Sequence, residues 1–352
     1  ARGDRLVYSN GVIALAAIVA TALAVNSSSA AAQTSYKDKT IKIVIPYGPG
    51  GTYDKYGQSF ARFIGKYVPG NPTVIVQHMP GAGGAKAMNW AYNVMPRDGY
   101  NLITPLDNSV LNQLMRPKRM RYDARNFTWL GSSNQTNMVM VARTDTGVNK
   151  WQDMRSTQLV GSTTGPNSMG FIMPMLIKSL LGVKLRMVSG YKGSSKVIFA
   201  VERGESQFAA SNWLAWSSKV PHWFRGEKKF AQPILQMGIF RDPDLPQDIP
   251  MLGNLVKNPA DKKVVRFISV MGLLGRGLAL PPKASKDSVR ILRAAYDKMN
   301  ADKAFEAELK KRLLRLMPST GAQIQKIVKE AVESATPEVV SRARKLIYGG
   351  KS

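Results

Sequence analysis

Glycine-rich turns that join apolar strands to helices are the parts of this sequence that could do chemistry, and that chemistry is anion binding. In Ile41–Asp54 (IKIVIPYGPGGTYD) an apolar strand leads into Gly50 and Gly51 and then into a helical pattern. The first backbone N–H groups of a helix lack intrahelical partners and lie at the positive end of its dipole, so they stabilise a carboxylate or phosphate. Asp54 can cap the same groups, so an anion would share the site with it or use the loop amides just upstream.

A second turn, Met79–Gly84 (MPGAGG), repeats this arrangement after the expected strand Thr73–His78. In open α/β sheets, ligands bind at the carboxyl edge of the parallel strands, and both turns would lie at that edge. A purely structural strand-to-helix turn is the alternative for either turn taken alone.

A third turn, Val160–Ser168 (VGSTTGPNS), belongs to the second half of the chain. Its Thr163, Thr164, Asn167 and Ser168 serve either as donors to a ligand or as simple helix caps. Two helix N-termini that face each other across a cleft would suit a ligand with a carboxylate at each end. Further candidates for the cleft wall are VSGYKGS at 188–194, Ser211 and Asn212.

Two successive runs of alternating strands and helices position these turns, which is typical of parallel α/β domains. The first run extends from Ile41 to about Ser133, and the second begins near Met138. An apolar run from Val264 to Leu280 follows, and then long helices at about 285–301, 303–315, 320–335 and 337–347. We therefore expect a two-lobed, hinged α/β fold. Lobe 1 would comprise 33–138 plus 263–352, and lobe 2 would comprise 139–262.

The composition argues against several kinds of chemistry. The 352 residues include no cysteine, which rules out disulfides and thiolate nucleophiles, and the only histidines are His78 and His222. No H-E-x-x-H, complete G-x-G-x-x-G or phosphate loop occurs, and Thr163 stands where a nucleophile elbow needs Ser. We therefore expect no enzyme activity, no metal site and no cofactor.

The N-terminus has the pattern of a secretory signal peptide. Arg2 and Arg5 precede the apolar run Gly11–Val25, and small residues lead to Ala32, the expected cleavage position. Residues 1–32 would thus direct the chain out of the cytoplasm. A retained membrane anchor is the alternative, although the apolar run is shorter than the ~20 residues that a spanning helix needs.

The formal net charge of +27 indicates an affinity for acidic partners. Basic residues cluster at 116–125, 225–229 and 310–315, and we expect the last cluster to lie on the solvated face of one helix. Such surfaces attract anionic ligands, acidic lipid headgroups or a protein partner. No nucleic-acid recognition motif accompanies the charge, so we do not expect nucleic-acid binding.

Seven motifs occur in the order and spacing of the Bug-type periplasmic solute-binding receptors of tripartite tricarboxylate transporters, and the chain resembles this family over essentially its whole length after residue 32. The motifs are IKIVIPYGPGGTYD at 41–54, MPGAGG at 79–84, PRDGYNL at 96–102, RYDARNFTWLGS at 121–132, GSTTGPNS at 161–168, YKGS at 191–194 and LPQDIPML at 245–252.

The resemblance implies a periplasmic Venus-flytrap protein that grips a small di- or tricarboxylate, largely by backbone amides, and delivers it to a membrane permease. The ligand contacts that it implies are Tyr47, Gly50, Gly51, Thr52, Asp54, Asn108, Ser109, Thr163, Thr164, Asn167, Ser168, Tyr191 and Asn212. Family members often have a His shortly after the Gly/Ser loop and an Asp near position 212. This chain has Met169, Gly170 and Phe171 after that loop, and Asn212 in place of the acid.

Two other hypotheses stay open. A membrane-anchored accessory subunit of a larger complex, derived from such a receptor, would retain its leader and use the basic clusters to contact partners or acidic headgroups. A secreted enzyme acting on anionic substrates is the third hypothesis, and no constellation of residues supports it.

Overall fold

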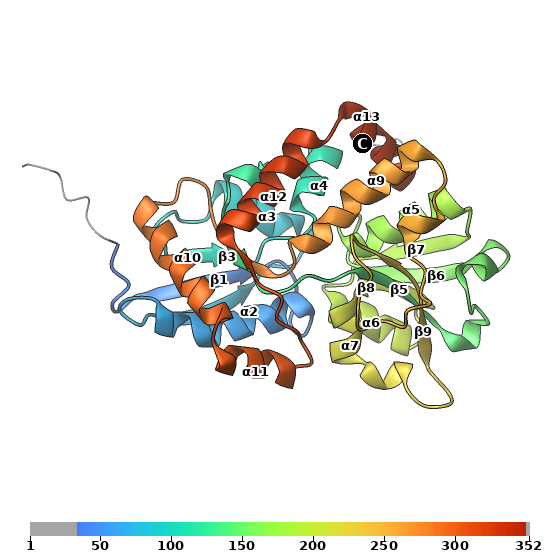
Figure 1. The fold of residues 1–352 in the computed structure, drawn as a ribbon, viewed down its shortest axis with the longest axis horizontal. Coiled ribbons are helices and arrows are strands. Elements are labelled where there is room, and N and C mark those ends of the chain that lie inside the picture. The colour runs from blue at the N-terminus through green and yellow to red at the C-terminus, as the bar shows by residue number, and fades with distance from the viewer. Residues whose placement is uncertain (1–33, 350–352) are drawn as a thin grey trace, which may run out of the picture. The chain divides into compact units, whose positions relative to one another are not determined.

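The computed structural model describes residues 34–349, whose helices pack around two β-sheets (Figure 1). The expected signal segment, residues 1–32, lies outside the described residues. Within 34–349, no helix combines the length and the apolar character needed to cross a membrane. The two-sheet α/β architecture that the sequence predicts is confirmed.

The first sheet contains both parallel and antiparallel strands. Its strand β1 is buried along most of its length because it lies between β3 and β2, whereas β2 alternates in exposure, as an edge strand does. These three strands are parallel, as expected for the run from Ile41 to about Ser133, whereas β10 and β11, which come from outside that run, are antiparallel to their neighbours. In spatial order the strands are β11 (Ser319–Thr320), β4 (Thr128–Ser132), β10 (Gly277–Leu280), β3 (Asn101–Ile103), β1 (Thr40–Ile45) and β2 (Thr73–His78).

The second sheet is mixed as well. Strands β7, β6 and β8 are parallel, and β5 pairs antiparallel with both β8 and β9. In spatial order the strands are β7 (Leu185–Ser189), β6 (Leu159–Thr163), β8 (Phe208–Asn212), β5 (Met138–Arg143) and β9 (Ala231–Met237). The chain passes from the first sheet to the second between Ser132 and Met138 and returns between Met237 and Gly277.

Helices with one apolar face cover the first sheet. On the helix that follows β1, the buried positions Tyr56 and Phe60 recur at helical spacing, and Phe60 packs edge-on against Tyr296. Phe305 joins this aromatic cluster and is fully buried. The helices of this group are α2 (Thr52–Phe63), α3 (Ala85–Asn93), α4 (Ser109–Met115), α10 (Lys286–Asn300), α11 (Lys303–Lys311) and α12 (Gly321–Ser334).

A second group of helices surrounds the second sheet, where Trp216 and Trp223 pack together in a separate apolar cluster. The group comprises α5 (Met169–Leu181), α6 (Ser194–Glu202), α7 (Trp213–Lys219), α8 (Leu252–Leu255) and α9 (Pro259–Ser269). The last helix, α13 (Pro337–Tyr348), packs against α4, α5 and α9 and thus contacts helices of both groups (Figure 1). Short 3₁₀ helices lie at Ile64–Tyr67, Ala82–Gly84, Ala124–Asn126, Thr144–Thr146, Trp151–Arg155, Pro221–Phe224 and Val270–Leu273.

One expected lobe limit coincides with the start of a strand, and the other falls inside a helix. The limit at 138/139 lies at the first residue of β5, whereas the limit at 262/263 lies inside α9. The apolar run Val264–Leu280 is divided between the end of α9, a 3₁₀ helix and β10. The exact lobe limits stay a prediction.

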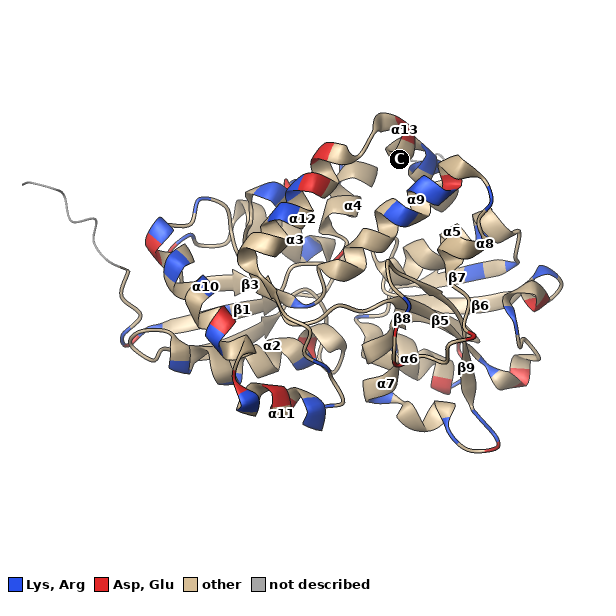
Figure 2. Ribbon diagram, viewed as in Figure 1, with Lys and Arg blue, Asp and Glu red and all other residues tan. Residues whose placement is uncertain are grey.

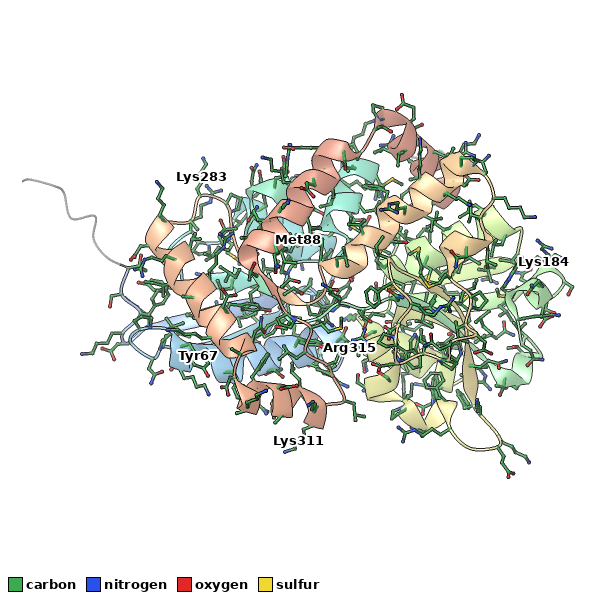
Figure 3. The ribbon with its side chains drawn as sticks, in the orientation of Figure 1. Tyr67, Met88, Lys184, Lys283, Lys311 and Arg315 are labelled. Carbon is green, nitrogen blue, oxygen red and sulfur yellow. The ribbon has the colours of Figure 1, made fainter. Side chains whose placement is uncertain are left out.

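The basic cluster at 310–315 differs from its expected form. In the view of Figure 2 basic residues are spread over several helices, but α11 ends at Lys311, and Leu313 has a left-handed φ of +58°. Arg315, labelled in Figure 3, is largely buried and pairs with Asp242 at 2.8 Å and Asp244 at 2.9 Å. The prediction that Arg315 lies on a solvated helix face is therefore wrong. Its guanidinium neutralises the fully buried Asp242 carboxylate, which would otherwise be an unpaired buried charge.

Candidate functional site

The carboxyl ends of parallel strands from both sheets meet at a partly open cavity of about 70 Å³. At about 10–15 Å³ per water-sized group, this volume holds roughly five such groups, which suits a short ligand. Its wall combines hydroxyl, amide, apolar and charged side chains. The lining residues are Tyr47, Gly51, Thr52, Tyr53, Asp107, Met138, Thr163, Thr164, Ser168, Met169, Gly170, Ser194, Val197, Ala210, Ser211, Asn212 and Arg276.

Three helices of eight or more residues begin at this cavity. Their N-cap residues are Gly51 for α2, Ser168 for α5 and Gly193 for α6, and none of the three makes a side-chain capping hydrogen bond. The first amides of these helices thus lack a side-chain acceptor at the cap and carry the positive end of three helix dipoles. At the shorter α7, by contrast, Asn212 accepts a hydrogen bond from the Ala215 amide.

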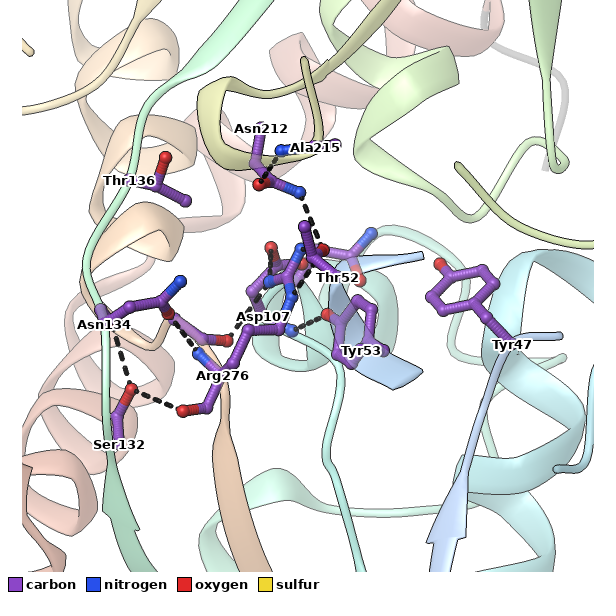
Figure 4. A network of polar contacts seen from close by, with 12 residues as sticks. Tyr47, Thr52, Tyr53, Asp107, Ser132, Asn134, Thr136, Asn212, Ala215 and Arg276 are labelled. Atoms are coloured by element: carbon purple, nitrogen blue, oxygen red, sulfur yellow. Dashed lines mark hydrogen bonds and ion pairs between the residues drawn. The ribbon is translucent and has the colours of Figure 1, made fainter. Parts of the chain in front are cut away.

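Arg276 places a fixed positive charge in the wall (Figure 4). Its side chain is only 4% exposed, and Nη1 donates to Asp107 Oδ2 at 2.9 Å and to the Gly275 carbonyl at 3.2 Å. The centre of the guanidinium lies 3.7 Å from the centroid of the Tyr53 ring, which holds the guanidinium by a cation–π contact. The Arg276 backbone amide donates to Asn134 Oδ1 at 2.6 Å, so the main chain is fixed as well.

The Thr52 hydroxyl connects this arginine to the second sheet. Its oxygen accepts hydrogen bonds from Arg276 Nε and Nη2, both at 3.2 Å, and from Asn212 Nδ2 at 3.1 Å. Since a hydroxyl oxygen has two lone pairs, these donors occupy its acceptor capacity. Its own proton has no acceptor among the described residues, so Thr52 is a donor toward whatever occupies the cavity.

Burial fixes the protonation states in this wall. Burial raises the pKa of the Tyr53 and Tyr47 phenols well above their ordinary value, so both stay protonated. Burial alone would lower the pKa of the Arg276 guanidinium, but the adjacent Tyr53 and Asp107 raise it above its ordinary value. Arg276 is therefore a permanent cation.

Seven of the thirteen residues predicted from the sequence line this cavity, and their contact with a ligand stays a prediction. They come from turns more than a hundred residues apart in the sequence, which the two sheets bring together. The seven are Tyr47, Gly51, Thr52, Thr163, Thr164, Ser168 and Asn212.

Three predicted residues, Gly50, Asp54 and Tyr191, lie outside the wall of this cavity. Asp54 Oδ2 accepts the Gly50 amide at 2.8 Å and Asp54 Oδ1 contacts His78 Nε2 at 2.7 Å, so this carboxylate caps the loop rather than the first helical amides. Gly50 is thereby engaged by the protein itself. Tyr191 lies with Tyr47 beside a neighbouring hollow, and its hydroxyl donates to Glu205 at 3.2 Å.

The other three predicted residues do not line the cavity, and two of them, Asn108 and Asn167, make contacts between the two sets of elements. Asn108 Nδ2 donates to the Asn167 carbonyl at 2.5 Å, and Asn167 Nδ2 donates to the Ala82 carbonyl at 2.9 Å. Arg116 Nη1 donates to Asn167 Oδ1 at 2.6 Å, which completes the bonding of this asparagine. Ser109 is fully buried, with a hydroxyl that has no hydrogen-bond partner within the described residues.

Sequence reasoning missed three polar or aromatic residues of the wall, Tyr53, Asp107 and Arg276, whereas Ser194 and Ser211 were further candidates for the cleft wall and do line the cavity. The rule that ligands bind at the carboxyl ends of parallel strands would have found Asp107 but not Arg276. Asp107 follows β3 by a few residues, and Arg276 immediately precedes β10, whose antiparallel direction brings its N-terminal end to the carboxyl edge of the parallel strands. That direction was not visible in the sequence.

Lys55 on α2 contacts Ser218 on α7, and its surroundings predict that the stability of the protein depends on pH. Its Nζ donates to the Ser218 carbonyl and hydroxyl at 3.2 and 3.0 Å, and burial, followed by the charge of Lys219, lowers its pKa from the ordinary 10.5 to about 8. Between pH 8 and 10.5 the unfolded chain holds a proton on Lys55 that the folded protein has released. Stability therefore rises with pH in this interval.

We expect the melting temperature of the wild-type protein to rise relative to that of Lys55→Met as the pH rises from about 8 toward 10.5. Below pH 7 the difference between the two melting temperatures should stay constant. Thermal unfolding of both proteins across this range measures it. A difference that is flat with pH would show that Lys55 titrates normally in the folded protein.

Within residues 34–349, no group of three or more His, Asp or Glu side chains could hold a metal ion. The wall of the cavity contains hydrogen-bond donors, the Arg276 guanidinium and the Asp107 carboxylate. Its donors and its guanidinium are groups that favour an acceptor-rich anion.

Comparisons with known proteins identify the fold. No protein-family model and no curated protein sequence matches the chain. Among solved structures, the periplasmic binding protein BugD superposes with a TM-score of 0.71 at 18% identity, covering 88% of this chain and 98% of its own. The chain has a periplasmic-binding-protein fold.

Two further solved structures share this periplasmic-binding-protein fold and hold acids. An R. palustris protein solved with adipate matches with a TM-score of 0.69 at 16% identity, covering 88% of this chain and 98% of its own. MatC from Rhodopseudomonas palustris, solved with bound malate, matches with a TM-score of 0.67 at 17% identity, covering 88% and 99%. The two-lobed fold expected from the sequence is thus confirmed.

Proposed function

We propose that this protein is a solute-binding receptor that captures a short carboxylate in the cavity between its two sheets. One observation carries the proposal: the first amides of α2, α5 and α6 and the buried Arg276 guanidinium converge on one cavity. Each of these groups favours negative charge, and together they come from both sheets. The carboxylates held by proteins of the same fold support this assignment of ligand class.

In this proposal the two lobes, 33–138 plus 263–352 and 139–262, close on the ligand by a hinge motion. Contacts that join the two sets of elements would stabilise the closed form, including the hydrogen bond from the Gly48 amide to the Lys192 carbonyl at 2.7 Å. The receptor would work in the periplasm and hand its ligand to a membrane permease. The basic surface would serve that partner or the acidic membrane surface next to it.

Thermal unfolding of the full-length protein against mono-, di- and tricarboxylates tests the ligand class. At a concentration of 100 times Kd, an acid is expected to add about 2.7 kcal/mol of stability. That corresponds to a rise in melting temperature of roughly 5–10 °C, at about 2–4 °C per kcal/mol. The neutral diamides of the same acids should give no rise. If no acid raises the melting temperature, the receptor assignment fails.

Negative charge placed at the helix N-termini should abolish binding. We expect Ser168→Glu and Gly51→Glu to lose the ligand-induced rise, because each puts a carboxylate where the ligand's carboxylate would lie. The matched controls are Ser168→Gln and Gly51→Gln, which have nearly the same size without the charge. They matter because a Cβ at Gly51 would already lie 2.6 Å from Ser194 Oγ. Equal affinity of the Glu and Gln variants would contradict the site.

A further inference from the structure

Asp107 is a feature of the cavity that carboxylate binding alone does not explain. It is a negative charge in the wall of a site proposed to bind negative charge, and its side chain is 15% exposed. One of its oxygens, Oδ2, accepts from Arg276 Nη1 at 2.9 Å. The other, Oδ1, accepts no hydrogen bond from any described residue. Asp107 lines the cavity, so a bound ligand can donate a hydrogen bond to this oxygen, and an acceptor that a ligand strips of water without replacing the hydrogen bond is costly.

The position of Asp107 is fixed by the structure around it. Its backbone amide donates to the Tyr53 hydroxyl at 3.0 Å, and Tyr53 in turn lies against the Arg276 guanidinium. The carboxylate therefore cannot turn freely toward another partner. Arg276 is held as firmly, by Thr52, Gly275 and Asn134.

The wall thus presents two kinds of recognition side by side. The donors that attract a carboxylate are the helix amides, the hydroxyl proton of Thr52 and the second proton of Arg276 Nη2. No described residue accepts a hydrogen bond from that Nη2 proton. Asp107 Oδ1 is an acceptor that repels one. An unsubstituted acid satisfies only the donors. An acid that also carries a hydroxyl or ammonium group satisfies both.

We propose that Asp107 is a specificity-determining residue that accepts a hydrogen bond from a hydroxyl or ammonium group on the carboxylate ligand. This inference rests on the proposed receptor function and narrows it to hydroxy- or amino-substituted short acids. Sites built to hydrogen-bond a substituent discriminate strongly against the analogue that lacks it, because their polar group is then left unpaired. Ammonium differs from hydroxyl in that it gains from the charge of Asp107 as well as from its acceptor.

Calorimetric titration of the full-length protein with succinate, malate and aspartate tests the proposal, since these acids share one carbon skeleton. The same comparison with propionate, lactate and alanine covers shorter ligands. On the wild-type protein, at least one substituted acid is expected to bind at least about tenfold more tightly than its unsubstituted parent. A preference for malate or lactate identifies hydroxyl as the group that is read, and a preference for aspartate or alanine identifies ammonium.

Asp107→Asn separates charge from hydrogen bonding. The amide keeps an oxygen acceptor but removes the negative charge beside Arg276, so the variant should bind succinate more tightly than the wild type does. It should retain a preference for hydroxyl and lose a preference for ammonium. A misfolded protein cannot gain affinity, so this readout does not depend on unchanged stability. The control is Asp145→Asn, which removes an exposed carboxylate paired with Arg143 and should change no affinity.

These measurements test the role of Asp107 and the receptor function separately. If succinate and propionate bind as tightly as their substituted counterparts, or Asp107→Asn changes all acids by the same factor, the role of Asp107 is overturned while the receptor function stands. If the wild-type protein binds none of the acids in either series or in the broader thermal panel, the receptor function itself is overturned.

Discussion

Replacing Arg276 by Met is expected to destabilise the protein by about 3–5 kcal/mol and to remove carboxylate binding. The variant leaves the Asp107 carboxylate in a largely buried wall without its counter-ion, and Thr52 loses two of its donors. Removing one partner of a buried ion pair is costly because the remaining charge is desolvated but unpaired. Chemical denaturation gives the stability change, and titration with the best acid gives the loss of binding.

A matched control separates this effect from the loss of any arginine. Arg62 pairs with Glu308 at 2.7 Å, but its side chain is 60% exposed, so Arg62→Met should cost only about 0–1 kcal/mol. The double variant Arg276→Met with Asp107→Leu should recover much of the stability, since both charges are then gone, and should still fail to bind acids. If Arg276→Met is as stable as Arg62→Met and binds acids normally, Arg276 has no role in the site.

The second large effect is expected at Gly275, the residue just before Arg276. Its φ is +55°, and a Cβ atom there would overlap the carbonyl oxygen of Asn134, whose side chain also holds the Arg276 amide. Gly275→Ala must therefore shift backbone as well as adopt a left-handed conformation. Left-handed φ alone costs about 1–2 kcal/mol, and the forced shift adds about 1–3 kcal/mol.

Gly147→Ala is the matched control for this prediction. Gly147 has a φ of +74°, and a Cβ there would meet nothing within 4 Å. Its substitution should cost only the conformational part, about 1–2 kcal/mol. Denaturation midpoints of the two variants give the difference directly. Equal midpoints would mean that the loop at Asn134 yields without cost and that Arg276 is not held as the structure describes it.

The sequence predicted local structure well wherever the signal was local. The expected strand Thr73–His78 matches β2 in full, the second run does begin at Met138 with β5, and the glycine turn at 50–51 does precede a helix. Hydrophobic periodicity and turn residues carry this information within a few positions. The prediction of two α/β units follows from the same signal.

Strand direction and the charged part of the cavity could not be predicted in the same way. The pairing of β10 with β3 and β4 joins segments far apart in sequence, and nothing in Gly277–Leu280 indicates antiparallel pairing. Arg276 stood inside a run that appeared to be ordinary core. Similarly, Arg315 looked like part of a solvated basic helix, although it pairs with the buried Asp242. Long-range ion pairs leave no periodic pattern in a sequence.

The central claim is that a short carboxylate is bound at the helix N-termini beside Arg276. A crystal structure of the protein with the acid that gives the largest rise in melting temperature tests this most directly. We expect carboxylate oxygens within hydrogen-bond distance of the first amides of α2 and of at least one of the helices α5 and α6, with Arg276 and Thr52 next to them. An acid bound outside this cavity, or one that touches none of these groups, would contradict it.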